Sequence, residues 1–255
     1  MNRSVAVLAI FGVLLSSHVA LSQAKTDYTV VVQDYVDFPP YSAYKDKKYS
    51  GFNRELLDLF ATSKGYKFKY VAFPVKRLFF EFVNGVGDMK YPDNPKWALH
   101  VKKDAPIVYS DAVVQYIDGV MVLPSNKGNN IDSVKNLGVV AGWTPWVYMK
   151  RKKAGKVKLL ENSSYEGLLK QAMFGRNDGA YSNVSTSQYY LKNVLKKPGA
   201  LVFDDNLLHV RSARTLSSIK HPKLIAEFNH FLKSHSAEIG ALKNKYSVED
   251  GIVTK

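Results

Sequence analysis

Strands and helices are predicted to alternate in the first half of the chain, because the hydrophobic positions switch between two periodicities. Residues 28–33 are mostly β-branched, which is typical of a buried strand. Leucine and phenylalanine at 56, 59 and 60 share one side of a helix that we expect to begin at Asn53, a suitable N-cap, and to end at Gly65. The same patterns predict two strands and a helix between them, at 67–71, 87–91 and 77–83. This alternation indicates a parallel α/β sheet.

A second series of strands and helices follows a long apolar segment at 113–123. This segment suits a strand that crosses between two lobes, and 207–210 suits a strand that returns. Thr144 and Pro145 predict the start of a helix, because threonine is a good cap and proline is favoured in the first turn. Further strands are expected at 137–142 and 179–182, and further helices at 165–174, 184–194 and 222–245. We therefore predict an α/β protein whose first lobe, 25–115 and 208–255, is interrupted by a second lobe, 116–207.

The first 24 residues have the pattern of a signal peptide and not of the fold. Arg3 makes the start positive, and residues 5–15 are apolar apart from Gly12. Residues 22–24 have the small-x-small form that signal peptidase cleaves. Because 5–15 is too short to span a bilayer, we expect export with cleavage, and a mature chain that starts near Lys25.

The absence of cysteine limits the cellular compartments in which we expect the mature protein. The 255 residues include no cysteine, which excludes disulfides, thiol catalysis and Cys-ligated metal sites. Exported eukaryotic domains usually carry disulfides, and a bacterial lipoprotein needs a cysteine to hold its lipid. The mature protein is therefore expected to lie free in the periplasm of a bacterium, without a lipid anchor.

The net charge of +14 comes from 36 basic and 22 acidic residues. The basic residues are spread along the chain in short runs, which we interpret as solvated surface and not as a nucleic-acid interface. The sequence has no phosphate-binding loop, dinucleotide fingerprint or hydrolase elbow. Its six histidines lack the spacing of metal ligands. We therefore expect neither a metal nor a cofactor.

Five short motifs occur in a fixed order along the mature chain. They are Phe-Pro-Pro-Tyr-Ser at 38–42, Gly-Phe-Asn-Arg-Glu-Leu-Leu at 51–57, Phe-Pro-Val-Lys-Arg with Gly-Val-Gly-Asp at 73–77 and 85–88, Tyr-Ser-Asp-Ala-Val at 109–113, and Gly-Arg-Asn-Asp-Gly-Ala at 175–180. In this order they resemble the amino-acid-binding family of type II periplasmic solute-binding proteins of ABC importers. The resemblance implies the periplasmic-binding-protein type II fold, with two lobes and a hinge of crossing strands. It also implies a monomer that captures a small polar ligand between the lobes and presents it to an ABC transporter permease or a membrane sensor.

The loops after the predicted strands are expected to line the cleft between the lobes. Aromatic and polar groups there suit a polar solute that has lost its water, and the helix start expected near Trp143 suits an anion. Each of these side chains could instead pack in the core or in a lid. The candidate ligand contacts are Tyr35, Phe38, Tyr41, Arg77, Lys90, Tyr91, Asp93, Trp97, Trp143, Thr144 and Asn183.

At two positions that hold the amino acid in members of this family, the present chain has a different residue. The arginine that the resemblance would place seven residues before Ser110, to hold the α-carboxylate, is Lys103 in this chain. A lysine offers a point charge without the planar fork of a guanidinium. The second-lobe aspartate that would meet the α-ammonium is Asn183. The resemblance therefore leaves the ligand open.

We expect a small polar solute that is amino-acid-like or carries a carboxylate. Arg77 or Lys90 would hold its negative charge. Tyr35 or Tyr41 would stack on it, and Trp143 would close over it.

Two alternatives depend on acidic residues. A cationic solute could be surrounded by Tyr35, Phe38 and Trp97 through cation–π contacts, with Asp93 as the counter-charge. An exported enzyme on the same fold, similar to a dehydratase, would need a general acid or base in the cleft. Asp93 and Asp88 are the candidates for that role, although Asp88 lies where a strand begins and is expected to be structural. We expect binding and not catalysis.

Overall fold

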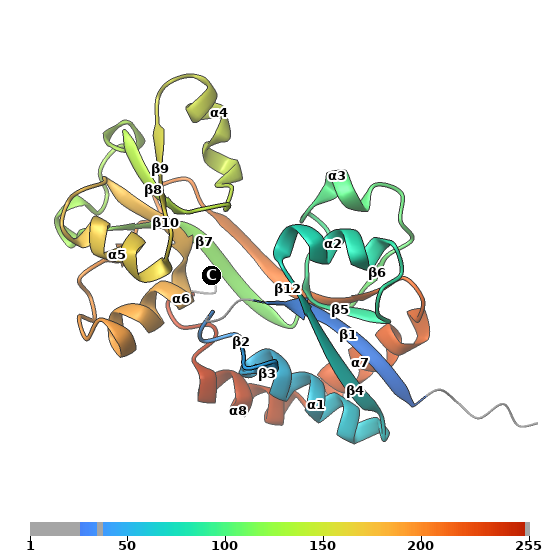
Figure 1. The fold of residues 1–255 in the computed structure, drawn as a ribbon. Helices are drawn as coiled ribbons and strands as arrows, with labels where there is room; N and C mark the ends of the chain where they lie inside the picture. Colours follow the sequence, from blue (N-terminus) through green and yellow to red (C-terminus); the bar gives the residue numbers. More distant parts are fainter. Residues whose placement is uncertain (1–25, 35–37, 253–255) are drawn as a thin grey trace, which may run out of the picture.

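The computed structural model describes residues 26–34 and 38–252. Two lobes are joined by a pair of long strands, as Figure 1 shows. The predicted signal peptide, 1–24, and the candidate contact Tyr35 lie outside the described residues.

The sheet of the first lobe is built around β1 (Asp27–Gln33). This strand pairs in parallel with β4 (Lys67–Phe73) on one side and with β5 (Met89–Asp93) on the other. On the far side of β5, β12 (Val210–Ser218) pairs with it in the antiparallel direction. The alternation of strands and helices at the start of the chain therefore gives a parallel sheet, as predicted.

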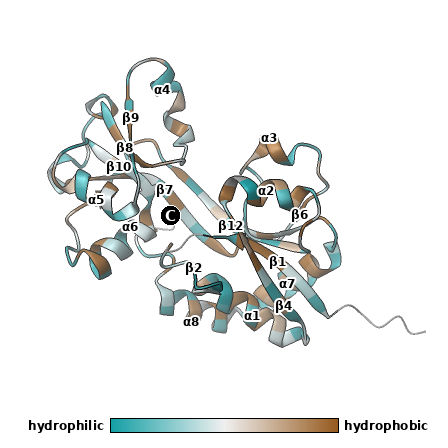
Figure 2. Cartoon of the chain, viewed as in Figure 1, coloured by the Kyte–Doolittle hydropathy of each residue, from teal (hydrophilic) through white to brown (hydrophobic). Residues whose placement is uncertain are grey.

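Helices cover both faces of this sheet, because successive side chains of β1 point to opposite sides. Val31 packs against α2 (Val75–Val83), whereas the valines on either side of it share a core with α1 (Phe52–Lys64) and α7 (Pro222–Ser234). Figure 2 shows hydrophobic and hydrophilic residues side by side along α1 and along α8 (Ser236–Tyr246). Burial of each large apolar side chain stabilises the fold by about 1.5–3 kcal/mol.

The second lobe has a sheet of its own around β10 (Gly179–Asn183). This strand pairs antiparallel with β7 (Val114–Val122) and in parallel with β8 (Asn136–Val140). Next to β8 lies β9 (Lys158–Asn162), again in parallel. The helix α5 (Tyr165–Met173) packs on this sheet through buried leucines.

The strands β7 and β12, which we refer to as the crossing strands, connect the lobes. They pair antiparallel over 114–118 and 210–214. The strand β7 continues into the sheet of the second lobe, and β12 continues into the sheet of the first lobe. The return strand starts at Val210, where the strand expected at 207–210 ends, and runs to Ser218. The exact boundaries of the lobes, after residues 115 and 207, stay a prediction.

The remaining elements are short. They are β2 (Ala43–Lys45), β3 (Lys48–Ser50), α3 (Leu99–Lys102), β6 (Val108–Tyr109), α4 (Met149–Lys153), α6 (Val184–Tyr189), β11 (Val202–Phe203), 3-10 turns at Pro124–Asn126, Ile131–Ser133 and Trp146–Tyr148, and a π-helical turn at Tyr190–Val194. In the described part of the chain, no helix has the length and apolar character needed to cross a bilayer.

The helix α1 ends where the sequence predicts but begins differently. Gly65 is its C-cap in the left-handed conformation, as expected. The N-cap is Gly51, whereas Asn53 lies inside the helix with its side chain buried, so the prediction of Asn53 as the cap is wrong. Gly51 has a φ of 94°, and a Cβ at this position would lie 2.9 Å from the backbone oxygen of Tyr41. Glycine is therefore required at this turn.

The helix predicted to start at 144–145 is also wrong. Pro145 precedes a 3-10 turn, and the α-helix that follows, α4, has only five residues. Thr144 caps no helix and is exposed to solvent. The expected anion site at a helix start beside Trp143 therefore lacks its helix.

Candidate functional site

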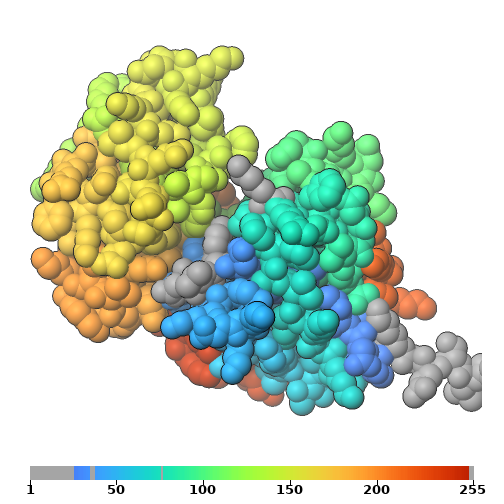
Figure 3. Space-filling model, in the orientation of Figure 1, coloured from blue at the N-terminus to red at the C-terminus, as the bar shows by residue number. Residues whose placement is uncertain are grey.

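Polar groups from both crossing strands lie together where the two lobes meet. Figure 3 shows a hollow between the lobes on the face in view. In the pairing of the crossing strands, Tyr116 lies opposite Ser212, and Val114 lies opposite Arg214. Paired residues and every second residue of a strand point to the same side, so Asp118 belongs to this row as well. The row gives the junction of the lobes a cation, a carboxylate and hydroxyl groups.

Aromatic side chains from both lobes converge on this junction. Phe38 and Tyr41, from the segment after β1, stack with their ring centres 5.6 Å apart. Trp143, from the turn after β8 in the second lobe, meets Phe38 edge-on at 5.8 Å and Tyr165 of α5 at 6.0 Å. Four rings from distant parts of the sequence thus form one aromatic cluster, most of it buried.

Arg214 is a buried cation within this aromatic group. It is 4% exposed, and its guanidinium carbon lies 3.8 Å from the centre of the Tyr41 ring. The rings of Phe38 and Tyr116 lie 5.4 and 5.5 Å away. The buried Nε has no hydrogen-bond partner, and no described residue forms an ion pair with the guanidinium. The positive charge is therefore stabilised by the faces of aromatic rings and by attraction to the carboxylate of Asp118, with which it forms no ion pair.

Asn183 links the second lobe to this junction. Its side-chain amide donates a hydrogen bond to Oδ1 of Asp118 at 3.1 Å, and its own Oδ1 lies 3.4 Å from the Tyr41 hydroxyl. The same oxygen accepts from the backbone N–H of Thr186 and thereby caps α6. Loss of hydration raises the pKa of Asp118, although the bond from Asn183 and the charge of Arg214 act in the opposite direction.

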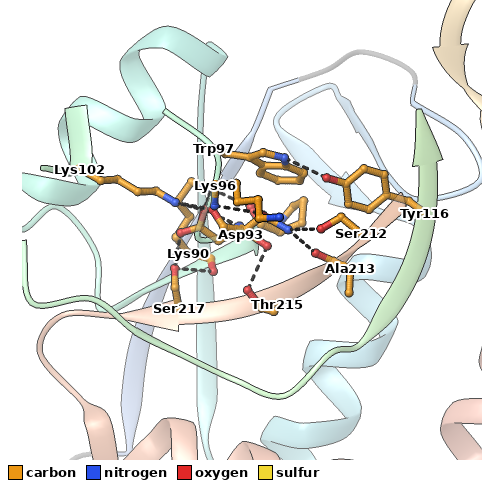
Figure 4. A network of polar contacts seen from close by, with 12 residues as sticks. Lys90, Asp93, Lys96, Trp97, Lys102, Tyr116, Ser212, Ala213, Thr215 and Ser217 are labelled. Carbon is orange, nitrogen blue, oxygen red and sulfur yellow. Dashed lines mark hydrogen bonds and ion pairs between the residues drawn. The ribbon is translucent and has the colours of Figure 1, made fainter. Parts of the chain in front are cut away.

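Lys90 and Asp93 lie in a separate, fully buried network inside the first lobe, shown in Figure 4. The Nζ of Lys90 is 3.3 Å and that of Lys102 is 2.7 Å from Oδ1 of Asp93, and the Ser217 hydroxyl donates to Oδ2 at 2.6 Å. Burial lowers the pKa of Lys90 to about 8. Burial would raise the pKa of Asp93, but the two lysine charges outweigh it and hold that pKa below its usual value. The charges of the two candidate ligand contacts, Lys90 and Asp93, are therefore compensated inside the first lobe by each other.

This network is connected to the crossing strands. Asn94, next to Asp93, donates from its side chain to the Ser212 hydroxyl at 2.9 Å and to the backbone oxygen of Ala213 at 2.7 Å. Figure 4 shows these contacts together with Trp97, whose ring lies beside that of Tyr116. The network therefore fixes the position of the segment after β5 relative to the crossing strands.

The other candidates lie away from the junction or inside the core. The Arg77 side chain is 64% exposed on α2, where its Nε lies 2.8 Å from Glu81. Thr144 is exposed, and Tyr91 is completely buried in the core of the first lobe. The structure therefore brings together Phe38, Tyr41, Trp143 and Asn183, and it separates them from Arg77.

Sequence patterns missed Arg214 and Asp118. Asp118 carries a signal that could have been used, because it is a charged residue within the apolar segment 113–123. Arg214 lies beyond the predicted return strand, so nothing in the sequence places it opposite that segment. Among the described residues, no group of three potential ligands could hold a metal ion.

A pocket of about 730 Å³ lies elsewhere, between α6 and the end of α8. Its lining includes Gln188, Lys192 and Tyr246 and none of the residues that meet at the crossing strands. The C-terminal segment beside it contacts both lobes, because Val248 accepts from the Tyr41 hydroxyl at 3.0 Å and Asp250 accepts from Ser185 at 2.9 Å.

Comparisons with known proteins show the fold. No protein-family model and no curated protein matches the chain by sequence. Solved structures do match, among them the periplasmic VFT2 domain of BvgS from Bordetella pertussis, with a TM-score of 0.66 and 15% identity over 87% of this chain and 93% of that one.

Two further structures are similar. An arginine 3rd transport system periplasmic binding protein from Legionella pneumophila has a TM-score of 0.64 and 13% identity, over 87% of this chain and all of that one (100%). The ancestral amino-acid-binding protein AncCDT-1, a precursor of cyclohexadienyl dehydratase, has a TM-score of 0.63 and 19% identity, over 87% and 95%. The chain therefore has the two-lobed periplasmic-binding-protein type II fold, which confirms the fold predicted from its motifs.

Proposed function

We propose that this protein is a periplasmic solute-binding protein, which captures a small polar solute between its lobes and presents it to an ABC importer or a membrane sensor. The observation that carries this proposal is the meeting of Phe38 and Tyr41 from the first lobe with Trp143 from the second, at the crossing strands. The structural similarity to an arginine 3rd transport system periplasmic binding protein supports delivery to an importer, and the similarity to the periplasmic VFT2 domain of BvgS is compatible with the same fold in another periplasmic role.

Lobe closure is the mechanism that this arrangement suits. A solute that touches residues of both lobes binds the closed form more tightly than the open form and shifts the equilibrium toward it. Phe38, Tyr41, Trp143 and Asn183 are the proposed contacts, since they come from both sides of the junction. The ligand would be amino-acid-like or carboxylate-bearing, and the mature protein would be a free monomer in the periplasm that starts near Lys25.

Calorimetry of the mature protein against the twenty L-amino acids and small dicarboxylates tests this function. A compound that saturates should also reduce the radius of gyration in small-angle scattering. Trp143→Ala should weaken its binding by about tenfold or more, as expected for a buried aromatic contact. Trp146→Ala is the matched control, because Trp146 is a tryptophan of the same turn region that is 74% exposed. Saturation with an unchanged radius would contradict the closure mechanism.

One observation favours an enzyme as the second candidate. Asp118 is a carboxylate at the junction with a raised pKa, a property that general acids and bases share. Asp93 is less suited to this role because two lysines hold its carboxylate. Asp88 is less suited because its carboxylate accepts a hydrogen bond from the backbone N–H of Thr29 and lies 2.8 Å from Nε2 of His221. Heat that continues after saturation, with new products that Asp118→Asn abolishes, would establish catalysis.

A further inference from the structure

We infer that Arg214 holds the negative charge of the ligand and that this charge is a carboxylate. The inference rests on the solute-binding function proposed above and adds to it the residue and the chemical group. Sequence patterns pointed to Arg77 or Lys90 instead, both of which have acidic partners in the structure.

Arg214 differs from a comparable arginine in what surrounds it. Arg54 also lies over a tyrosine ring, with its guanidinium carbon 4.3 Å from the centre of Tyr70, but it forms an ion pair with Asp58 at 2.5 Å and is partly exposed. Arg214 has the closer ring contact and almost no exposure, yet no ion pair within the described residues. Within the described part of the chain, Arg214 therefore has no ion pair like the one that Arg54 forms with Asp58.

A buried, unpaired guanidinium is costly to the folded protein. Removing a charge from water costs several kcal/mol even after relaxation, whereas a cation–π contact returns only about 0.5–2 kcal/mol. The nearest carboxylate in this row, Asp118, already accepts from Asn183 and forms no ion pair with Arg214. An anion from outside the protein would supply the missing interaction.

The geometry selects a planar anion. The Tyr41 ring lies against the guanidinium at 3.8 Å, so the ring occupies one face of the group. Its N–H groups point outward in the guanidinium plane, and two of them match the two oxygens of a carboxylate. A lysine at this position would keep the charge but lose this match.

A first experiment needs no knowledge of the ligand and uses acetate as the probe. Sodium acetate should raise the melting temperature of the mature protein above its value in sodium chloride of equal ionic strength, and acetamide should not. Arg214→Met should remove the difference, whereas Arg54→Met should keep it. An acetate effect of equal size in Arg214→Met would overturn the inference.

A second experiment uses whichever carboxylate of the amino-acid and dicarboxylate panel binds the wild-type protein. Loss of a charged hydrogen bond corresponds to a roughly 10- to 100-fold weaker affinity. We expect a loss in that range for Arg214→Lys, a larger loss for Arg214→Met, and an unchanged affinity for Arg54→Met. The neutral amide of the same compound should bind the wild-type protein at least tenfold more weakly, a comparison that needs no variant.

The outcomes separate the two proposals. An acetate effect that depends on Arg214, without binding of any panel member, would support the anion site and contradict the proposed solute class. Binding of a panel member with equal affinity to wild type and Arg214→Met would support the solute-binding function and overturn the role of Arg214. Failure of both experiments would overturn both.

Discussion

The indole Nε1 of Trp97 donates a hydrogen bond to the Tyr116 hydroxyl over 3.1 Å. Trp97 follows β5 of the first lobe, whereas Tyr116 lies on a crossing strand with its ring 5.5 Å from the guanidinium of Arg214. One contact therefore connects the fixed interior of the first lobe to the group proposed to hold the ligand.

The bond between Trp97 and Tyr116 should couple the two side chains energetically. Tyr116→Phe removes the acceptor and keeps the ring, so we expect the free energy of unfolding to fall by about 0.5–1.5 kcal/mol. Trp97→Phe should cost at least as much, and the double variant should lose less than the sum, as measured by urea unfolding. Losses that simply add would show that the bond contributes nothing.

Removal of the buried carboxylate at 93 should be strongly destabilising. Asp93→Asn leaves Lys90 and Lys102 buried without a counter-charge, and breaking such a pair costs about 3–5 kcal/mol. Asp111→Asn is the control, because that carboxylate is half-exposed and lies 3.9 Å from Lys233. Its loss should cost less than about 1 kcal/mol. Similar urea midpoints for the two variants would contradict the role of the network.

The free energy of unfolding should rise by about 1 kcal/mol between pH 7 and 9 on account of Lys90. Burial lowers the pKa of Lys90 to about 8, whereas an unfolded chain has a value of about 10.4. Between these values the unfolded chain binds more protons than the folded chain, so stability increases with pH. Lys90→Met should flatten this part of the profile in urea unfolding at pH 7, 8 and 9. Equal slopes in both proteins would show that Lys90 does not titrate there.

Asn183→Asp should destabilise the protein at neutral pH and much less in acid. An aspartate can still cap α6, but it replaces the amide that donates to Asp118 with a second carboxylate. Like charges in contact raise the pKa of the pair, so the stability is present at low pH and is lost as the pH rises through the raised value. We expect a loss of about 1–3 kcal/mol at pH 8 that shrinks at pH 5. A loss independent of pH would point to the cap instead.

The order of strands and helices could be predicted from the sequence because it depends on local periodicity. The β-branched run at 28–33, the apolar side of α1 and the long strand at 113–123 are visible in a few residues each. Local sequence patterns could not decide whether a helix starts at 144–145. Threonine and proline also suit a 3-10 turn, and the packing of the second lobe decides between the two.

The candidate site was only partly predictable, because it depends on contacts between distant residues. Phe38 was chosen for its position after a strand and Trp143 for an expected helix start that the structure does not contain, and the structure brings the two rings together. Arg77 was chosen for its charge, but Glu81 lies one helical turn away and pairs with it at the surface. Arg214 became a candidate only because the structure shows it buried against Tyr41. The two residues are 173 positions apart in the chain, so no local sequence pattern could predict this contact.

The alternation of side chains along β7 limits the sequence changes by which this protein could come to prefer a different ligand. Insertion or deletion of one residue would reverse the two sides of the strand, so that Asp118 would exchange places with Ile117 or Gly119 and a carboxylate would enter the core. Loops tolerate such changes of length because they carry no register. Diversification among relatives should therefore proceed by replacement of individual residues on the crossing strands, and by lengthening or shortening of segments such as the turn after β8.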